Sequence, residues 1–131
     1  MPITGMNHGN IMSTDLAKTE AFYSLLGLTP GPRPKFQFGG LWLYAEGQPV
    51  LHVNLRPDLP ETRYPGGVFD HIAFTGTNLE GTVKNLRDAG HQVDVRALPP
   101  GDNIEPATQI FVTGPSGEKI EVVFPGATMS A

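Results

Sequence analysis

The sequence contains no cysteine, few basic residues and no long hydrophobic run. Without cysteine the chain has no disulfide, no thiolate metal site and no cysteine nucleophile. Nine basic residues against thirteen acidic ones give a formal net charge of −4, so we expect no nucleic-acid partner. The apolar runs are shorter than a membrane span, so no membrane association is expected. The N-terminus shows no basic segment followed by an apolar one, and we therefore expect a cytoplasmic protein.

The composition is globular and rich in turn residues. Of the 131 residues, 39% are hydrophobic and 17% are charged, which is typical of one folded domain with its own core. Sixteen glycines and thirteen prolines indicate many turns between short elements. We expect a single α+β domain over residues 1–131. It divides into a first module at about 5–57, a proline-rich linker at 58–67 and a second module at about 68–125.

Hydrophobic spacing predicts the same order of elements in each module: a strand, a helix, then three strands. Asp15 or Thr14 is expected to cap the first helix, and Asn78 or Thr77 the second, because these side chains accept hydrogen bonds from backbone N–H groups of the first turn. The helices are expected near 15–26 and 78–89, and the strands at 6–12, 36–38, 41–44, 50–55, 69–75, 92–95, 109–113 and 119–124.

The two modules also resemble each other residue by residue. Moving the sequence along by 63 residues superimposes five identical residues between positions 8 and 27 without a gap. Near the end of each module, a shift of 69 residues aligns the segment 51–53 with 120–122. The repeat predicts two βαβββ modules, with six extra residues in the loop around 97–108. The identical pairs are His8 and His71, Thr14 and Thr77, Leu16 and Leu79, Thr19 and Thr82, and Gly27 and Gly90.

Strand alternation places His8, His52, His71 and Glu121 on the polar faces of their strands, opposite the apolar faces. If the modules are related by a pseudo-two-fold axis, these four side chains point into one concave surface. Imidazoles and a carboxylate are good ligands for Fe²⁺, Mn²⁺, Ni²⁺, Co²⁺ or Zn²⁺. A lone histidine on a half-buried strand is usually only hydrogen-bonded, but repeat-related placement favours a metal site. His52 is either a fourth ligand or a pocket residue, and His91 is expected at the surface.

Aromatic residues near these positions are candidates for a substrate pocket. Trp42 aligns with Phe111 under the 69-residue shift, so the two are expected to face the same way. Core packing is the alternative role for these rings. Arg33 and Lys35 lie in a proline-rich stretch and are either anion-binding groups or solvated surface charges. The candidate substrate-binding residues are Trp42, Tyr44, Phe111, Asn54 and Arg33.

Three segments resemble the vicinal oxygen chelate superfamily of glyoxalases, bleomycin resistance proteins and extradiol dioxygenases. They are NHGNIMSTDLAKTEAFYSLLGL, FDHIAFTGTNLEGTVKNLRDAG and FVTGPSGEKIEVVFP, and the resemblance extends over about residues 5–125. It implies two βαβββ modules forming a curved, cup-like mixed sheet with helices on its outer face and a metal in the cup. It also implies that His8, His71 and Glu121 are metal ligands, with His52 at an optional fourth place, and that the chain forms a homodimer.

The same resemblance implies an enzyme acting on a small molecule that chelates the metal through two neighbouring oxygens. A glyoxalase-type lyase or isomerase is the first hypothesis, with His52 and Glu121 as the catalytic groups. Glyoxalase I usually has a carboxylate where this chain has His52, which weakens a literal lactoylglutathione lyase assignment. An Fe(II)-dependent extradiol-type dioxygenase is the second hypothesis, and a non-catalytic drug- or ligand-binding protein is the third.

Overall fold

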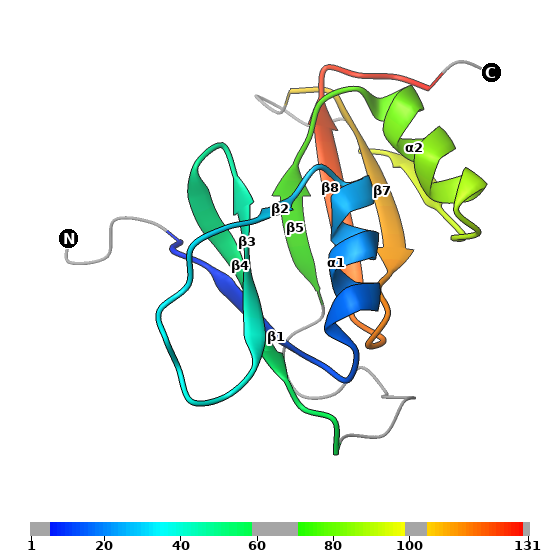
Figure 1. Ribbon diagram of the computed structural model, residues 1–131. Coiled ribbons are helices and arrows are strands. Elements are labelled where there is room, and N and C mark those ends of the chain that lie inside the picture. Colours follow the sequence, from blue (N-terminus) through cyan, green and yellow to red (C-terminus); the bar gives the residue numbers. More distant parts are fainter. Residues whose placement is uncertain (1–5, 59–70, 99–104, 130–131) are drawn as a thin grey trace. The chain divides into compact units, whose positions relative to one another are not determined.

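Each half of the chain folds as a strand, a helix and three further strands, as the sequence predicts (Figure 1). The computed structural model describes residues 6–58, 71–98 and 105–129. The chain divides into two compact units, Met1–Arg63 and Tyr64–Ala131, which we call module 1 and module 2. Apart from Asp58, the expected linker at 58–67 lies outside the described residues.

Module 1 forms a four-stranded mixed sheet in the order β1-β4-β3-β2. Strand β1 is parallel to β4, and the other pairs are antiparallel. The side chains of Leu43, Leu51 and Val53 are fully buried, which puts the apolar positions of β3 and β4 in the core. The elements are β1 (Gly9–Ser13), α1 (Leu16–Leu25), β2 (Thr29–Pro30), β3 (Gly40–Ala45) and β4 (Gln48–Leu55).

Module 2 repeats this topology in a sheet of order β5-β8-β7-β6. Strand β5 is parallel to β8, and β6, β7 and β8 are antiparallel neighbours. Ile110, Ile120 and Phe124 are buried, as the alternation along β7 and β8 predicts. The elements are β5 (Ile72–Thr75), α2 (Leu79–Asp88), β6 (Asp94–Ala97), β7 (Ala107–Thr113) and β8 (Lys119–Pro125).

The strand registers confirm the internal repeat. In module 1, His52 on β4 lies opposite Asn10 on β1 and Trp42 on β3. In module 2, Glu121 on β8 lies opposite Ala73 on β5 and Phe111 on β7. The 63-residue shift relates β1 to β5. The 69-residue shift relates β3 to β7 and β4 to β8. Equivalent residues therefore occupy equivalent places in the two sheets.

The helix ends also follow the sequence. The Asp15 side chain accepts a hydrogen bond from the Lys18 N–H, and Asn78 caps α2 through the Gly81 N–H. Gly27 and Gly90, which follow the two helices, have φ values of 87° and 94°, a left-handed conformation that suits glycine. Neither described helix is long and apolar enough to cross a membrane.

Four strand predictions need correction. Residues 36–38 form no strand; they belong to the loop between β2 and β3, and the preceding strand is instead the short β2 at Thr29–Pro30. The Phe36 N–H donates instead to the Pro34 carbonyl within the loop, so this group is not available to a neighbouring strand. The strand expected at 92–95 is found at Asp94–Ala97. His8 and His71 each lie one residue before β1 and β5 rather than inside a strand.

Candidate functional site

In module 2, two of the expected metal ligands lie side by side. His71 Nε2 is 3.0 Å from Glu121 Oε1. Glu121 is only 6% exposed, and its second oxygen accepts a hydrogen bond of 3.2 Å from Gln109 Nε2. Carboxylates are rarely buried unless they are paired, because loss of hydration destabilises the charge. The exposed His71 thus meets a buried carboxylate whose other oxygen already accepts a hydrogen bond.

In module 1, the other two expected ligands are also in contact. The imidazole rings of His8 and His52 are stacked, with centroids 3.7 Å apart. Trp42 stacks on His52 with centroids 3.9 Å apart. The His52 ring thus contacts both His8, which precedes β1, and Trp42 on β3.

The His52 imidazole is suited to bind a metal or to accept a proton. Its Nε2 atom is buried and has no hydrogen-bond partner in the described part of the chain. Burial lowers the pKa of His52 below 6.5, and the nearby His8 lowers this pKa further, against a smaller opposing effect of a backbone hydrogen bond at Pro49. His52 is therefore neutral at pH 7, the form in which an imidazole binds a metal or accepts a proton.

The two pairs occupy equivalent places in the two modules. His8 and His71 both stand just before the first strand of a module, and His52 and Glu121 each lie opposite the equivalent residue of that strand. Over residues 6–58, 71–98 and 105–129, no group of three or more His, Cys, Asp or Glu side chains comes together. Module 1 thus holds two imidazoles in contact, and module 2 an imidazole and a carboxylate, which are side chains of the kinds that bind divalent transition metals.

Phe111 borders the pair in module 2. It lies opposite Glu121, and its ring meets His71 edge-on at a centroid distance of 5.8 Å. The cationic groups of Arg96 and Lys119 lie 4.9 and 5.5 Å from the Phe111 ring centroid. Phe111 is half-buried, so part of its ring packs against the protein and part lies exposed beside His71.

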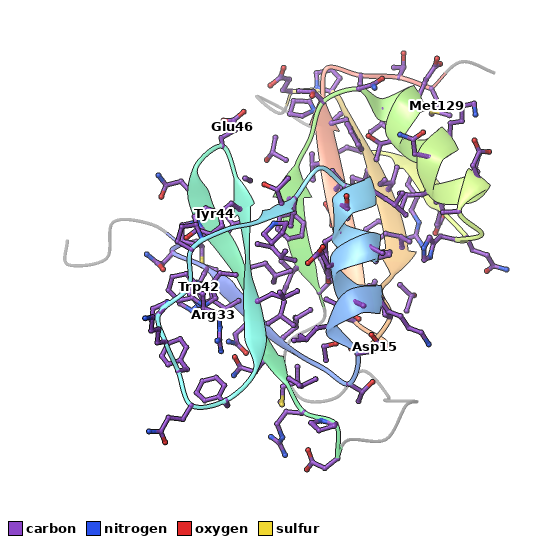
Figure 2. The ribbon with its side chains drawn as sticks, in the orientation of Figure 1. Asp15, Arg33, Trp42, Tyr44, Glu46 and Met129 are labelled. Atoms are coloured by element: carbon purple, nitrogen blue, oxygen red, sulfur yellow. The ribbon has the colours of Figure 1, made fainter. Side chains whose placement is uncertain are left out.

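Trp42 borders the pair in module 1, and Arg33 lies in the loop that precedes its strand (Figure 2). Trp42 is half-buried, and the Arg33 guanidinium lies over the rings of Phe36 and Phe38. Of the loop's two cations, Arg33 is therefore packed, whereas Lys35 is exposed.

Tyr44 and Asn54 have different surroundings. The Tyr44 hydroxyl donates a hydrogen bond of 2.5 Å to the Pro32 carbonyl, so this group is used within the loop. Asn54 is half-buried and lies opposite Met12 on β1, two residues beyond His52 on the same strand face. Asn54 is thus placed beside the histidine pair, while Tyr44 supports the loop that carries Arg33.

Two features of the site are not among the sequence predictions. The first is the hydrogen bond that Gln109 donates to Glu121. Pairing the expected strands 109–113 and 119–124 would have revealed it, because that pairing puts Gln109 and Glu121 on the same face of the sheet. Phe36 and Phe38 pack against Arg33, and only the conformation of their loop, in place of the expected strand, brings them there.

Known proteins resemble this chain in structure. No known family model and no curated protein matches the sequence. A glyoxylase/bleomycin resistance protein/dioxygenase domain from Frankia sp. superimposes with a TM-score of 0.76 at 13% identity, over 97% of this chain and 96% of that one. A glyoxalase family protein from Bacillus anthracis gives a TM-score of 0.68 at 18% identity, over 94% and 96%. The fosfomycin resistance protein FosX from Listeria monocytogenes gives 0.66 at 17%, over 97% and 94%.

These likenesses extend over nearly the whole chain and confirm the expected fold class. The protein has the α+β fold of the glyoxalase/bleomycin resistance/dioxygenase proteins, built from two βαβββ modules. At identities of 13–18% the likeness concerns the fold. The chemistry has to be argued from the residues themselves.

Proposed function

We propose that this protein is a metal-dependent enzyme of the glyoxalase type, a lyase or isomerase acting on a small substrate with two neighbouring oxygens. One observation carries the proposal: the expected ligands occur as two contacting pairs, His8 with His52 and His71 with Glu121, at equivalent places of the repeat. Packing alone does not require imidazoles and a buried carboxylate at matched positions of both modules.

His8, His71 and Glu121 would hold the metal. A divalent cation there would act as a Lewis acid and stabilise negative charge that develops on the substrate oxygens. Gln109 would keep the Glu121 carboxylate oriented. His52 would serve as a fourth ligand or as the general base that moves the substrate proton, and its neutral form at pH 7 supports both roles.

An Fe(II)-dependent dioxygenase is the second candidate. The observation that favours it is the donor set: two histidines and one carboxylate also form the facial triad of non-haem iron oxygenases. In that case His52 would stay unbound and available as a base. The identity of the metal separates the two candidates, because Ni, Co, Zn or Mn supports the first and Fe(II) with oxygen consumption supports the second.

The first experiment measures the metal content of protein purified without chelators. We expect one transition metal ion per chain in the wild type. Alanine at His8, His71 or Glu121 should lower the metal affinity by more than the 10–100-fold typical of outer-shell partners, because a direct ligand is lost. His91→Ala is the matched control, since it removes the one histidine outside the candidate site, and it should keep full occupancy. Full occupancy in His71→Ala would contradict the metal site.

His52→Ala distinguishes the two roles of this residue. If His52 is a base, the metal stays bound and turnover falls by about 10²–10⁴-fold, the usual contribution of acid–base catalysis. If it is a ligand, metal affinity falls as in the other variants. Oxygen-electrode assays with catechols then test the dioxygenase. Small-molecule binding that survives chelators, without any turnover, would instead indicate a non-catalytic binding protein.

A further inference from the structure

The loop between β2 and β3 holds the Arg33 guanidinium, which is only partly exposed. Arg33 Nη2 donates a hydrogen bond of 3.0 Å to the Phe38 carbonyl. No carboxylate of the described residues forms an ion pair with Arg33, and its Nε atom is buried without a hydrogen-bond partner there. A buried donor without an acceptor is costly and rare in folded proteins, so it calls for an explanation.

Two aromatic rings lie against this guanidinium, and a third ring lies beside one of them. Its central carbon lies 4.9 Å from the Phe36 ring centroid and 5.3 Å from that of Phe38. Phe36 and Phe38 are stacked on each other with centroids 5.0 Å apart, yet they are 45% and 49% exposed. The Phe36 centroid is also 6.5 Å from that of Trp42. We call Arg33, Phe36, Phe38 and Trp42 the Arg33 cluster.

The Arg33 cluster is continuous with the candidate metal-binding pair of module 1. Trp42 belongs to the cluster and stacks directly on His52. Gly40 contributes to this arrangement, because a Cβ atom at that position would clash with the Val53 carbonyl and lie 2.8 Å from Arg33 Nη2. The equivalent residue in module 2 is Gln109, so module 1 leaves space for the arginine where module 2 carries a side chain.

We propose that the Arg33 cluster binds the carboxylate of a small substrate that has a flat apolar body. The planar guanidinium fork matches a carboxylate, and exposed stacked rings suit a flat apolar group. A single negative charge is favoured, because Arg33 alone of the loop's two cations packs on the rings, whereas Lys35 is exposed. This inference deepens the proposed function and rests on it only for the reaction that follows binding.

Calorimetric titration of the metal-free protein with benzoate tests the site. Benzamide is the matched neutral ligand, because it keeps the ring and lacks the charge. The variants are Arg33→Gln, which removes the cation, and Arg33→Lys, which keeps the charge but loses the fork. Lys35→Gln is the matched control, since it removes a cation two residues away. Circular dichroism establishes that each variant is folded.

We expect benzoate to bind the wild type, and to bind both Arg33 variants at least tenfold more weakly. Lys35→Gln should bind within twofold of the wild type, and benzamide should bind at least tenfold more weakly than benzoate. Equal benzoate affinity in the wild type and either folded Arg33 variant would overturn the inference, as would equal affinity for benzoate and benzamide. Because these titrations contain no metal, failure of the metal site leaves their outcome unchanged. Conversely, loss of benzoate binding leaves the metal measurements intact.

Discussion

At the scale of single residues, Glu121 is the most informative side chain of module 2. Its carboxylate is buried, and the described contacts of its two oxygens are an imidazole and an amide rather than a Lys or Arg cation. An imidazole at 3.0 Å and an amide at 3.2 Å orient the carboxylate. Such an arrangement resembles the hydrogen-bonded carboxylates that support metal ligands in proteins.

Gln109 is therefore expected to act as a positioning residue. Gln109→Leu keeps the approximate size of the side chain and removes the hydrogen bond to Glu121. We expect metal affinity to fall by about 10–100-fold, the typical effect of losing a partner of a metal ligand. Metal-binding titrations followed by competition with a chelator measure this change.

The matched control is the same substitution at an exposed position of module 2, Gln92→Leu. It should bind metal as the wild type does. An unchanged affinity in Gln109→Leu would mean that Glu121 does not need its hydrogen bond to hold the metal.

At the scale of elements, the two helices end in the same way. Gly27 and Gly90 adopt a left-handed conformation, and a Cβ atom added at either position would have no other atom within 4 Å. Substitution by alanine is therefore opposed by backbone conformation alone. We expect Gly27→Ala and Gly90→Ala each to lower the free energy of unfolding by about 1 kcal/mol.

Urea denaturation measures these losses. Gly27→Asn and Gly90→Asn are the controls, because asparagine tolerates the left-handed region better than alanine. They should lose less stability than the alanine variants. Wild-type stability in both alanine variants would show that these turns do not constrain the helix ends.

These elements also show which structural features can be predicted from neighbouring residues in the sequence. Caps, terminal glycines and strand alternation are properties of neighbouring residues, so both helices and most strands could be predicted. The pairing of His71 with Glu121 followed from alternation combined with the repeat. The packing of Arg33 on Phe36 and Phe38 could not be predicted, because it depends on the path of an irregular loop where a strand was expected.

At the scale of the whole molecule, two modules of the same topology carry different side chains at equivalent positions. Trp42 and Phe111 are equivalent, as are His52 and Glu121, and the shared register explains why the repeat is visible in the sequence. Differences at equivalent places give one module an imidazole pair and the other an imidazole–carboxylate pair. The two modules thus share a topology but differ in the metal-binding side chains that they carry.

We expect the protein to form a homodimer in solution, as the family resemblance implies. Closed two-fold symmetry is also the commonest form of protein assembly. Sedimentation velocity in the micromolar range should give about twice the chain mass of 14.1 kDa. A single species of the chain mass across that range would contradict the dimer, and the metal titrations would then describe a monomer.

The stacking of Trp42 on His52 also makes the intrinsic tryptophan fluorescence sensitive to His52. Trp42 is the only tryptophan of the chain, so the indole emission of the whole protein reports on this one ring. Protonation of the stacked imidazole, or a metal ion with a partly filled d shell on it, provides a route for quenching the excited indole. The fluorescence of the unlabelled protein therefore follows the state of His52 directly.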